Sequence, residues 1–317
     1  MKTSQSNEQL IGGLAAVSAY FLWGVMPIYW KQLTVADFRE VLAERIIWSF
    51  VFMLIVLLLT KNMKPLFHDI RALIAAPKRL LSIIAAAFVI TVNWYIFIWA
   101  VDQNHVVQAS LGYYINPLIS VLLGIFFLKE RLSMWQVASF LLALIGVLIM
   151  TFQAGVFPWI SLTLAISFAL YGLLKKTVQL KAMTGLTIET FIASPAALLF
   201  ILAFNFNETK IMHADPMVNM LLIGSGVITA VPLLLFATGA NRISLAMVGF
   251  FQYIAPTIML ILGTLLYHEP FDHEHLVSFM LIWISLILFS LSRTKWFIRL
   301  ENMMFRKKLA PVQESKL

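Results

Sequence analysis

The chain has 317 residues, of which 61% are hydrophobic and only 12% are charged, and its mean hydropathy is +0.89. A water-soluble chain carries about 45–50% apolar and about 25% charged residues, so this composition excludes a soluble globular protein and indicates that the chain folds in lipid. The net charge of +8 does not indicate a nucleic-acid partner, because the basic residues lie in short loops and in the C-terminal tail rather than on one face.

Segments of about 20 mostly apolar residues, the length that crosses a bilayer, recur along the whole chain. They predict ten membrane-spanning helices at 10–31, 39–60, 79–101, 107–128, 133–152, 156–174, 184–204, 217–239, 244–267 and 275–292. The second span has an apolar stretch of only 14 residues, Ile46–Leu59, so its helix has to extend back through Glu44 and Arg45. Both charges are therefore expected inside the membrane. The polar segment Met1–Gln9 precedes a full-length span, so we expect no cleavable signal peptide.

The Lys and Arg residues alternate between the two sides of this ten-helix arrangement. If the N-terminus is cytoplasmic, 19 of the 23 fall on the inner side, with Lys31, Arg39 and Lys210 outside and Arg45 within a span. The positive-inside rule then predicts that both termini are cytoplasmic. Two further segments, 61–78 and 292–308, place apolar residues on one helical face among basic residues. They predict amphipathic helices on membrane lipid, with a regulatory partner site as the alternative.

A repeated motif divides the chain into two halves. The residues Tyr114-Ile115-x-Pro117, Gly124 and Glu130 recur 139 positions later as Tyr253-Ile254-x-Pro256, Gly263 and Glu269. Weaker echoes relate Trp23-Gly24 to Tyr171-Gly172 and Glu44 to Glu189. We therefore expect two five-helix repeats, at 1–155 and 156–317. Because five is odd, the second repeat is inverted in the membrane, which is typical of alternating-access transporters with a central site between the halves.

Several short motifs spread through both halves carry a resemblance to a known family. They are Trp23-Gly24-x-x-Pro27, Arg45-Ile46-Ile47-Trp48-Ser49, Asn93-Trp94, Phe97-Ile98-Trp99-Ala100, Ala109-Ser110-Leu111-Gly112-Tyr113, Ile115-Asn116-Pro117, Tyr171-Gly172 and Gln252-Tyr253-Ile254-Ala255-Pro256-Thr257. Over its whole length the chain resembles the EamA-type transporters of the drug/metabolite transporter superfamily, and particularly their RarD (chloramphenicol-sensitive protein) subgroup.

This resemblance implies ten helices around a central cavity and export or exchange of small metabolites or drugs across the bacterial inner membrane. It implies no particular substrate. The chain departs from the subgroup at one position, because the residue before Arg45 is commonly His there and is Glu44 in this sequence. A proton-relay role at this position is therefore in doubt.

Three ionisable residues, Glu44, Arg45 and Glu189, lie well inside predicted spans. A charge near the centre of a membrane helix costs about 2.5–3.5 kcal/mol on insertion scales, so each of them needs a partner or a function. We hypothesise that Arg45 lines the cavity and binds an anionic or carboxylate-bearing group. Glu189, and with it Glu44, is a candidate proton-coupling carboxylate. The alternative for each residue is an interhelical ion pair or a side chain that reaches the membrane surface.

Polar and aromatic residues near the membrane midplane form the candidate substrate site. With Arg45, they are Asn93, Trp94, Tyr113, Tyr114, Asn116, Gln252 and Tyr253. Pro117 and Pro256 each remove one backbone hydrogen bond and predict helix kinks at matching positions of the two repeats. Aromatic side chains around a polar centre suit amphipathic organic substrates better than bare ions. The alternative is ordinary packing between helices.

Sequence signatures of catalysis and metal binding are missing. The chain has no cysteine, and its segment 268–275, with Asp272, His273 and His275, has no second cluster to complete a four-ligand zinc site. Phosphate-loop, G-x-S-x-G and H-E-x-x-H motifs are absent as well. We expect no metal, no cofactor and no enzymatic activity, and we read Lys175 and Lys176 as inner-side anchors, with a gating role as the alternative.

The sequence thus predicts a secondary active transporter that moves a small organic metabolite or drug-like compound across the inner membrane by alternating access. Proton-coupled export is one form of this activity, and a lipid flippase or scramblase on the same scaffold is the alternative. The substrate and the oligomeric state are left open.

Overall fold

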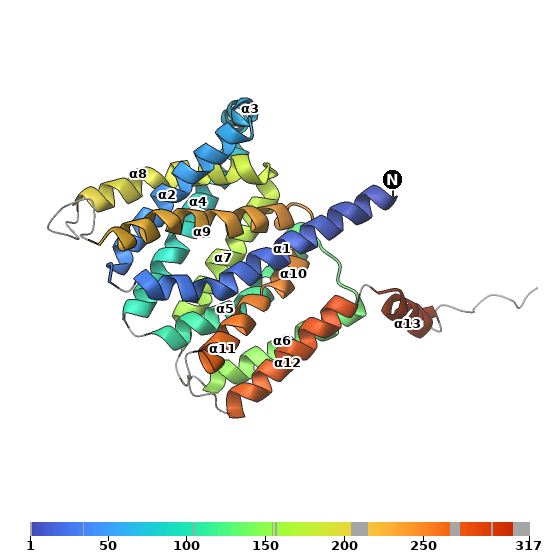
Figure 1. The fold of residues 1–317 in the computed structure, drawn as a ribbon. Coiled ribbons are helices and arrows are strands. Elements are labelled where there is room, and N and C mark those ends of the chain that lie inside the picture. The colour runs from blue at the N-terminus through green and yellow to red at the C-terminus, as the bar shows by residue number, and fades with distance from the viewer. Residues whose placement is uncertain are drawn as a thin grey trace, which may run out of the picture.

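The computed structural model describes residues 2–33, 35–103, 105–153, 155, 157–203, 215–266, 273–292 and 294–306 (Figure 1). Its helices are α1 (Lys2–Trp30), η1 (Lys31–Leu33), α2 (Phe38–Leu59), α3 (Met63–Ile74), α4 (Pro77–Asp102), α5 (Val106–Leu128), α6 (Met134–Gln153), α7 (Trp159–Val178), α8 (Ala182–Ala203), α9 (Pro216–Ala240), α10 (Leu245–Phe251), α11 (Ile254–Leu265), α12 (His273–Leu291) and α13 (Lys295–Arg306). No strand occurs in the described part of the chain.

The helices reproduce the ten predicted spans. Within the described ranges, nine segments are long and apolar enough to cross a bilayer, and α10 and α11 together form one of them. The tenth span is a shorter apolar stretch of α12, Leu276–Leu291. The prediction of an all-α membrane protein with ten spans is confirmed.

Local sequence signals fix where several helices begin and end. The Asp37 carboxylate accepts a hydrogen bond from the Arg39 N–H at 2.8 Å, and Asp215 caps α9 in the same way through Met217. Both follow the usual N-cap pattern, in which a short polar side chain satisfies a free N–H of the first turn. At the other end, Lys129 and Gln179 adopt left-handed backbone conformations that end α5 and α7.

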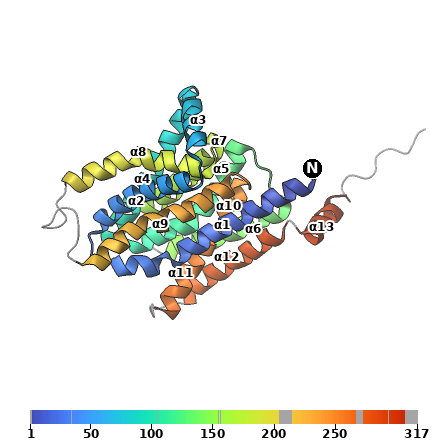
Figure 2. The ribbon, with the colours of Figure 1, turned by 45° about the horizontal axis from the view of Figure 1, so that its top comes forward.

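The two repeats interleave rather than forming separate bodies. The first comprises α1, α2, α4, α5 and α6, and the second comprises α7, α8, α9, α10–α11 and α12. The main contacts cross between them: α5 packs on α7, α4 on α7, α2 on α9, α1 on α9, α2 on α8, α4 on α8, α5 on α10, α1 on α11 and α6 on α12. The α6–α12 pair runs along one side of the bundle in both ribbon views (Figures 1 and 2).

These contacts obey a two-fold exchange of the repeats. Exchange converts the α5–α7 pair into α10–α11 on α1, the α2–α9 pair into α8–α4, and the α4–α7 pair into α9–α1. The pairs α6–α12, α2–α8 and α5–α10 convert into themselves, as pairs that lie on the axis must. The motif residues agree, because the Tyr253 hydroxyl donates to the carbonyl of Tyr114, its equivalent 139 positions earlier, at 3.2 Å.

A close approach between the repeats depends on a glycine. A Cβ atom on Gly226 of α9 would lie 2.3 Å from the carbonyl carbon of Trp48 in α2. The missing side chain lets the two backbones touch, and the Ser49 hydroxyl donates to the Gly226 carbonyl at 3.0 Å. Small residues at such crossings are typical of membrane helices, where packing replaces the hydrophobic driving force.

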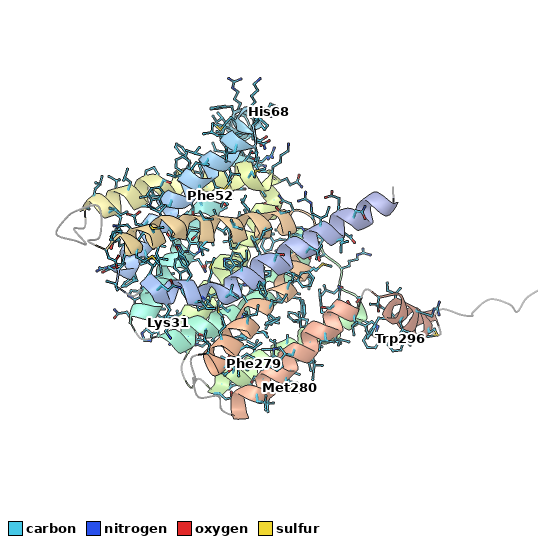
Figure 3. All side chains as sticks on the ribbon, in the orientation of Figure 1. Lys31, Phe52, His68, Phe279, Met280 and Trp296 are labelled. Carbon is cyan, nitrogen blue, oxygen red and sulfur yellow. The ribbon has the colours of Figure 1, made fainter. Side chains whose placement is uncertain are left out.

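Two further helices occupy the segments that the sequence predicts to be amphipathic. Helix α3 projects from the bundle, and His68 marks its tip, whereas α13 lies beside the end of α12 with Trp296 on its exposed surface (Figure 3). The Trp135 indole of α6 donates to the Phe297 carbonyl of α13 at 3.2 Å. Helix formation in both segments agrees with the sequence, and their position on lipid stays a prediction.

Candidate functional site

A first cavity opens between α4, α5 and α7. The space in it that a water-sized molecule can occupy is about 20 Å³, and its lining residues are Asn93, Phe97, Ala109, Gly112, Tyr113, Asn116, Leu164 and Phe168. The four residues from α5 recur at the three- and four-residue spacing that places side chains on one helical face. Two of them, Ala109 and Gly112, are small and leave room beside Tyr113 and Asn116.

The amides of this cavity are held by neighbouring helices. The Asn93 amide donates to the Leu164 carbonyl at 2.9 Å and to the Ser167 hydroxyl at 2.8 Å, so it ties α4 to α7. The Asn116 carbonyl oxygen accepts from the Ser120 hydroxyl at 3.1 Å. Both side chains are nearly buried. Three predicted site residues, Asn93, Tyr113 and Asn116, thus meet in one cavity.

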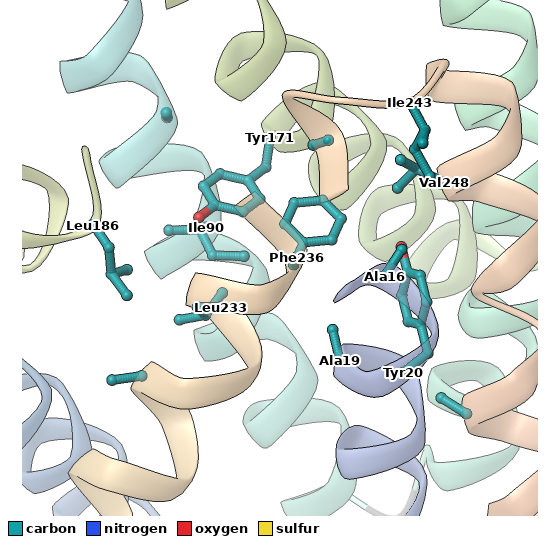
Figure 4. Close-up of a cluster of buried hydrophobic side chains, with 14 of the residues drawn as sticks. Ala16, Ala19, Tyr20, Ile90, Tyr171, Leu186, Leu233, Phe236, Ile243 and Val248 are labelled. Carbon is teal, nitrogen blue, oxygen red and sulfur yellow. The ribbon is translucent and has the colours of Figure 1, made fainter. Parts of the chain in front are cut away.

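A second cavity lies on the other side of α4. The space in it that a water-sized molecule can occupy is about 10 Å³, and it is lined by Ile46, Ala87, Ile90, Thr91, Trp94, Tyr171, Leu186, Glu189, Thr190, Ala193 and Leu233. Figure 4 shows Tyr171 beside the ring of Phe236, with Ile90, Leu186 and Leu233 around it. Because Asn93 and Trp94 are consecutive on one helix and point about 100° apart, they face different cavities.

Glu189 is part of a buried ion pair in the wall of the second cavity. Its Oε1 atom lies 2.7 Å from Lys175 Nζ, and its Oε2 atom accepts from the Tyr171 hydroxyl at 3.0 Å. The exposed fractions of the Glu189 and Lys175 side chains are 4% and 7%, so both charges are removed from solvent. Glu189 therefore has the partner that a buried carboxylate requires. Lys175 therefore reaches inward. An inner-side anchor, as the sequence analysis interpreted Lys175, would point to the membrane surface instead.

Arg45 lies between two indole rings. Its guanidinium carbon is 4.4 Å from the Trp94 ring centroid and 5.7 Å from the Trp30 centroid. Its Nε atom is buried and has no hydrogen-bond partner in the described part of the chain. The neighbouring Glu44 has an interaction of its own.

The remaining predicted residues lie behind the cavities, at the α5–α10 crossing. Tyr114, Gln252 and Tyr253 are buried, and the Tyr114 ring packs on Phe279 at 5.3 Å. The second-repeat span is interrupted at Gln252–Tyr253, between α10 and α11, just before Pro256. The first-repeat helix α5 continues through Pro117 without interruption. These residues are thus placed at the two-fold axis rather than in a cavity wall.

A further polar cluster closes one end of the bundle, where α5, α7 and α9 end and α10 begins. We call this end the basic face, since Lys129, Lys176 and Arg242 lie there. The Glu130 carboxylate accepts from the N–H groups of Leu245 at 2.6 Å and Ala246 at 3.0 Å, at the start of α10.

Lys176 completes this cluster by donating to the carbonyls of Ala240 and Ile243, where α9 ends. A carboxylate at a helix start and an ammonium at a helix end are both favourable placements. We call this arrangement the Glu130 clamp. It explains Gly124 in the repeated motif, because a Cβ there would lie 2.7 Å from Glu130 Oε2.

No group of three metal-ligating side chains is present within the described ranges. Of the segment 268–275, which the sequence analysis weighed as a zinc site and set aside, residues 268–272, including Asp272, lie outside those ranges.

Comparison with known proteins shows which family has this architecture. The EamA-like transporter family matches the chain twice, over residues 10–152 and 158–291. This chain belongs to the EamA-like transporter family. The two matches correspond to the two repeats, and the predicted resemblance is confirmed. The chain is therefore a multi-pass membrane transporter of the drug/metabolite superfamily.

Relatives of this EamA protein match it over nearly their whole length. It is 45% identical to the "Uncharacterized transporter YojE" of Bacillus subtilis, over 92% of this chain and 97% of that protein. It is 40% identical to "Protein RarD" of Escherichia coli, over 88% and 93%, and 27% identical to the "Chloramphenicol-sensitive protein RarD" of Pseudomonas aeruginosa, over 87% and 92%. A crystal structure at 15% identity, with a TM-score of 0.70 over 92% of this chain and 99% of that one, shares the fold.

Proposed function

We propose that this EamA protein is a secondary transporter that moves a small organic compound across the bacterial inner membrane by alternating access. The observation that carries the proposal is the pair of small cavities between interleaved inverted repeats, on both sides of α4. Pockets that bury a drug-sized ligand contain about 300–1,000 Å³. The space that a water-sized molecule can occupy is only about 20 Å³ in the first cavity and about 10 Å³ in the second, so a substrate requires the helices around α4 to separate.

The substrate site in this proposal joins the two cavities. Asn93, Tyr113 and Asn116 supply hydrogen-bonding groups from one side of α4, and Trp94 supplies an apolar face from the other. Tyr114, Gln252 and Tyr253 act one layer away, at the crossing of α5 and α10, where their movement changes the position of the α5 face that lines the first cavity. Pro117 and the interrupted span before Pro256 give this crossing its freedom to bend.

The basic face supports an assignment of sides. The positive-inside rule makes this face cytoplasmic and puts both termini there. The Glu130 clamp joins the first repeat to α10 of the second and holds that face together. Opening toward the cytoplasm then requires the start of α10 to leave Glu130.

We propose proton coupling at the Lys175–Glu189 pair, with Glu44 as a secondary candidate. Protonation of Glu189 would remove the charge that Lys175 neutralises and free the lysine from the cavity wall. Because the same carboxylate accepts from Tyr171 in the second cavity, protonation and the shape of that cavity are linked. This link favours Glu189 over a carboxylate that faces lipid.

The test combines substrate discovery with flux. Metabolites that differ between a deletion strain and an overexpressing strain identify candidates, and purified protein in liposomes then reports their flux with and without a pH gradient. We expect gradient-dependent flux that the Glu189→Gln variant loses. Flux of fluorescent phospholipid without flux of any enriched metabolite would instead favour the flippase. Unchanged pH dependence in Glu189→Gln would refute coupling at Glu189.

A further inference from the structure

The Arg45 guanidinium is stacked but not hydrogen-bonded at Nε. A cation–π contact uses the flat face of the guanidinium, whereas its N–H donors point outward in the plane. The contact with Trp94 therefore leaves the N–H donors at the edge of the group unsatisfied, and Nε is buried without a partner among the described residues. Buried polar groups in native structures nearly always have a partner, so an unmet donor on a charged group requires an explanation.

The nearby carboxylates do not supply the missing partner. Glu44 is the adjacent residue on α2, and neighbours on a helix point about 100° apart and do not face each other. Glu40 and Glu44 have interactions of their own, and Glu189 is paired with Lys175. No ion pair of Arg45 occurs within the described ranges. The positive charge of Arg45 is therefore balanced by no carboxylate in that part of the chain.

Arg45 lies beside the second cavity. Its guanidinium lies over the ring of Trp94, and it precedes Ile46 on α2; both of these residues line that cavity. Arg45 is seven residues beyond Phe38, the first residue of α2, which places it about 10 Å along the helix. A cation at this depth is costly alone and becomes favourable when an anion joins it.

We propose that Arg45 is the oxyanion-binding residue of the substrate site, and that the substrate class is organic carboxylates with a planar apolar body. The carboxylate binds the free edge of the guanidinium through Nε and a terminal nitrogen, the bidentate geometry that favours arginine. The apolar body packs beside Trp94. This assignment rests on the proposed function and gives its site a chemical specificity.

A lipid phosphate offers the same oxyanion chemistry, so the experiment has to separate the two sources. Purified protein is placed in nanodiscs of phosphatidylcholine, which carry no net charge, and its thermal unfolding is followed as benzoate or 3-phenylpropionate is added. The neutral amides of the same two compounds serve as ligand controls. A ligand that binds the folded state raises the unfolding temperature with its concentration, and this dependence gives the affinity without any transport.

The variants are Arg45→Gln, Arg45→Lys and, as a matched control on the same helix, Arg39→Gln, whose side chain is exposed and paired with Asp37. We expect the carboxylates but not the amides to stabilise the wild type. Arg45→Gln is expected to weaken this binding at least about tenfold, Arg45→Lys by an intermediate factor, and Arg39→Gln not at all. The lysine variant and the amides keep the test valid if Arg45→Gln does not fold.

Three results would overturn the proposal: no stabilisation of the wild type by either carboxylate, equal stabilisation by the amides, or equal affinity in the Arg45 variants. A fourth result would show that the oxyanion comes from lipid. In that case nanodiscs of phosphatidylglycerol would stabilise the wild type but not Arg45→Gln, and neither carboxylate would stabilise the wild type. Flux of radiolabelled benzoate into liposomes is measured separately. Carboxylate binding without benzoate flux would support the Arg45 site and count against transport of benzoate. Benzoate flux together with an affinity that Arg45→Gln leaves unchanged would support transport and overturn the Arg45 site.

Discussion

The Lys175–Glu189 pair is expected to contribute strongly to stability, because removing one partner leaves a charge buried alone. The two side chains are at most 7% exposed, and their charged atoms are 2.7 Å apart. Breaking a buried pair in this way costs about 3–5 kcal/mol, whereas replacing both charges together costs far less. We therefore expect Lys175→Met and Glu189→Gln each to lower the free energy of unfolding by about 3–5 kcal/mol.

The double variant separates the interaction from the two individual losses. Lys175→Met with Glu189→Gln removes both charges and keeps side chains of similar size, so its cost should fall below the sum of the single costs by at least about 2 kcal/mol. Reversible unfolding of the detergent-solubilised protein by a denaturing detergent, followed through tryptophan fluorescence, measures all three variants. Lys181→Met is the matched control, since Lys181 follows α7 on the chain and is exposed.

Two outcomes would refute this reasoning. If each single variant lowers the free energy of unfolding by less than about 1 kcal/mol, the pair is solvated, because exposed ion pairs contribute no more than that. Additive costs, within about 0.5 kcal/mol, would mean that Lys175 and Glu189 do not depend on each other. In either case the buried pair would also lose its place in the coupling proposal.

Three further predictions concern sites outside the cavities. Glu130→Gln removes a carboxylate that accepts two backbone hydrogen bonds, and we expect it to cost about 1–3 kcal/mol in unfolding and to raise hydrogen exchange at the start of α10. Gly226→Val would force a side chain into the Trp48 backbone, so we expect little folded protein on size exclusion, whereas a valine at an exposed membrane position should be tolerated. Hydrogen bonding to Arg39 lowers the pKa of Asp37, so the stabilisation by this cap is fully present above the unfolded pKa of about 4 and is lost as pH falls through the folded pKa. We therefore expect Asp37→Asn to cost about 1 kcal/mol or less at neutral pH and nothing in strong acid. Thermal unfolding as a function of pH measures this difference.

The membrane architecture could be predicted from the sequence because lipid imposes length and composition on every span. The constant offset of 139 residues also identified Tyr114 and Tyr253 as equivalent, and the structure places them in direct contact. What the offset did not give is the interleaving of the repeats. A repeat is visible in the chain, but which helix packs on which depends on surfaces that hydropathy does not resolve.

The site was harder to predict because neighbouring residues on a helix face different surroundings. Tyr113 and Tyr114 were predicted together, yet only Tyr113 lines a cavity. The spacing of Ala109 and Gly112 with Tyr113 could have indicated the cavity face. Phe97, Leu164 and Phe168 line the same cavity, and no polarity distinguishes them from core residues.

The pairing of Lys175 with Glu189 was missed for a related reason. The connection between α7, which ends at Val178, and α8, which begins at Ala182, is short, so Lys175 and Glu189 are only 14 positions apart in the chain. Lys175 next to Lys176 instead suggested a basic anchor at the membrane surface. The structure divides the two, because Lys175 turns inward to Glu189 and Lys176 binds the end of α9.

The two repeats share a scaffold but not its charges, and this difference has consequences for alternating access. Glu189 of the second repeat echoes Glu44 of the first, and Tyr171 echoes Trp23. Tyr171 and Trp23 are 148 positions apart, and the same offset pairs Lys175 with Pro27. The first repeat therefore has no equivalent lysine, and Arg45 stacks on indole rings instead. If both repeats carried the same ion pair, inward-open and outward-open packings would be near images of each other with similar energies. Among the described residues, one repeat holds a satisfied ion pair and the other a cation without a carboxylate partner. Our two proposals therefore assign a proton and an anionic substrate to opposite halves, where each would change the balance between the two packings by its own binding energy.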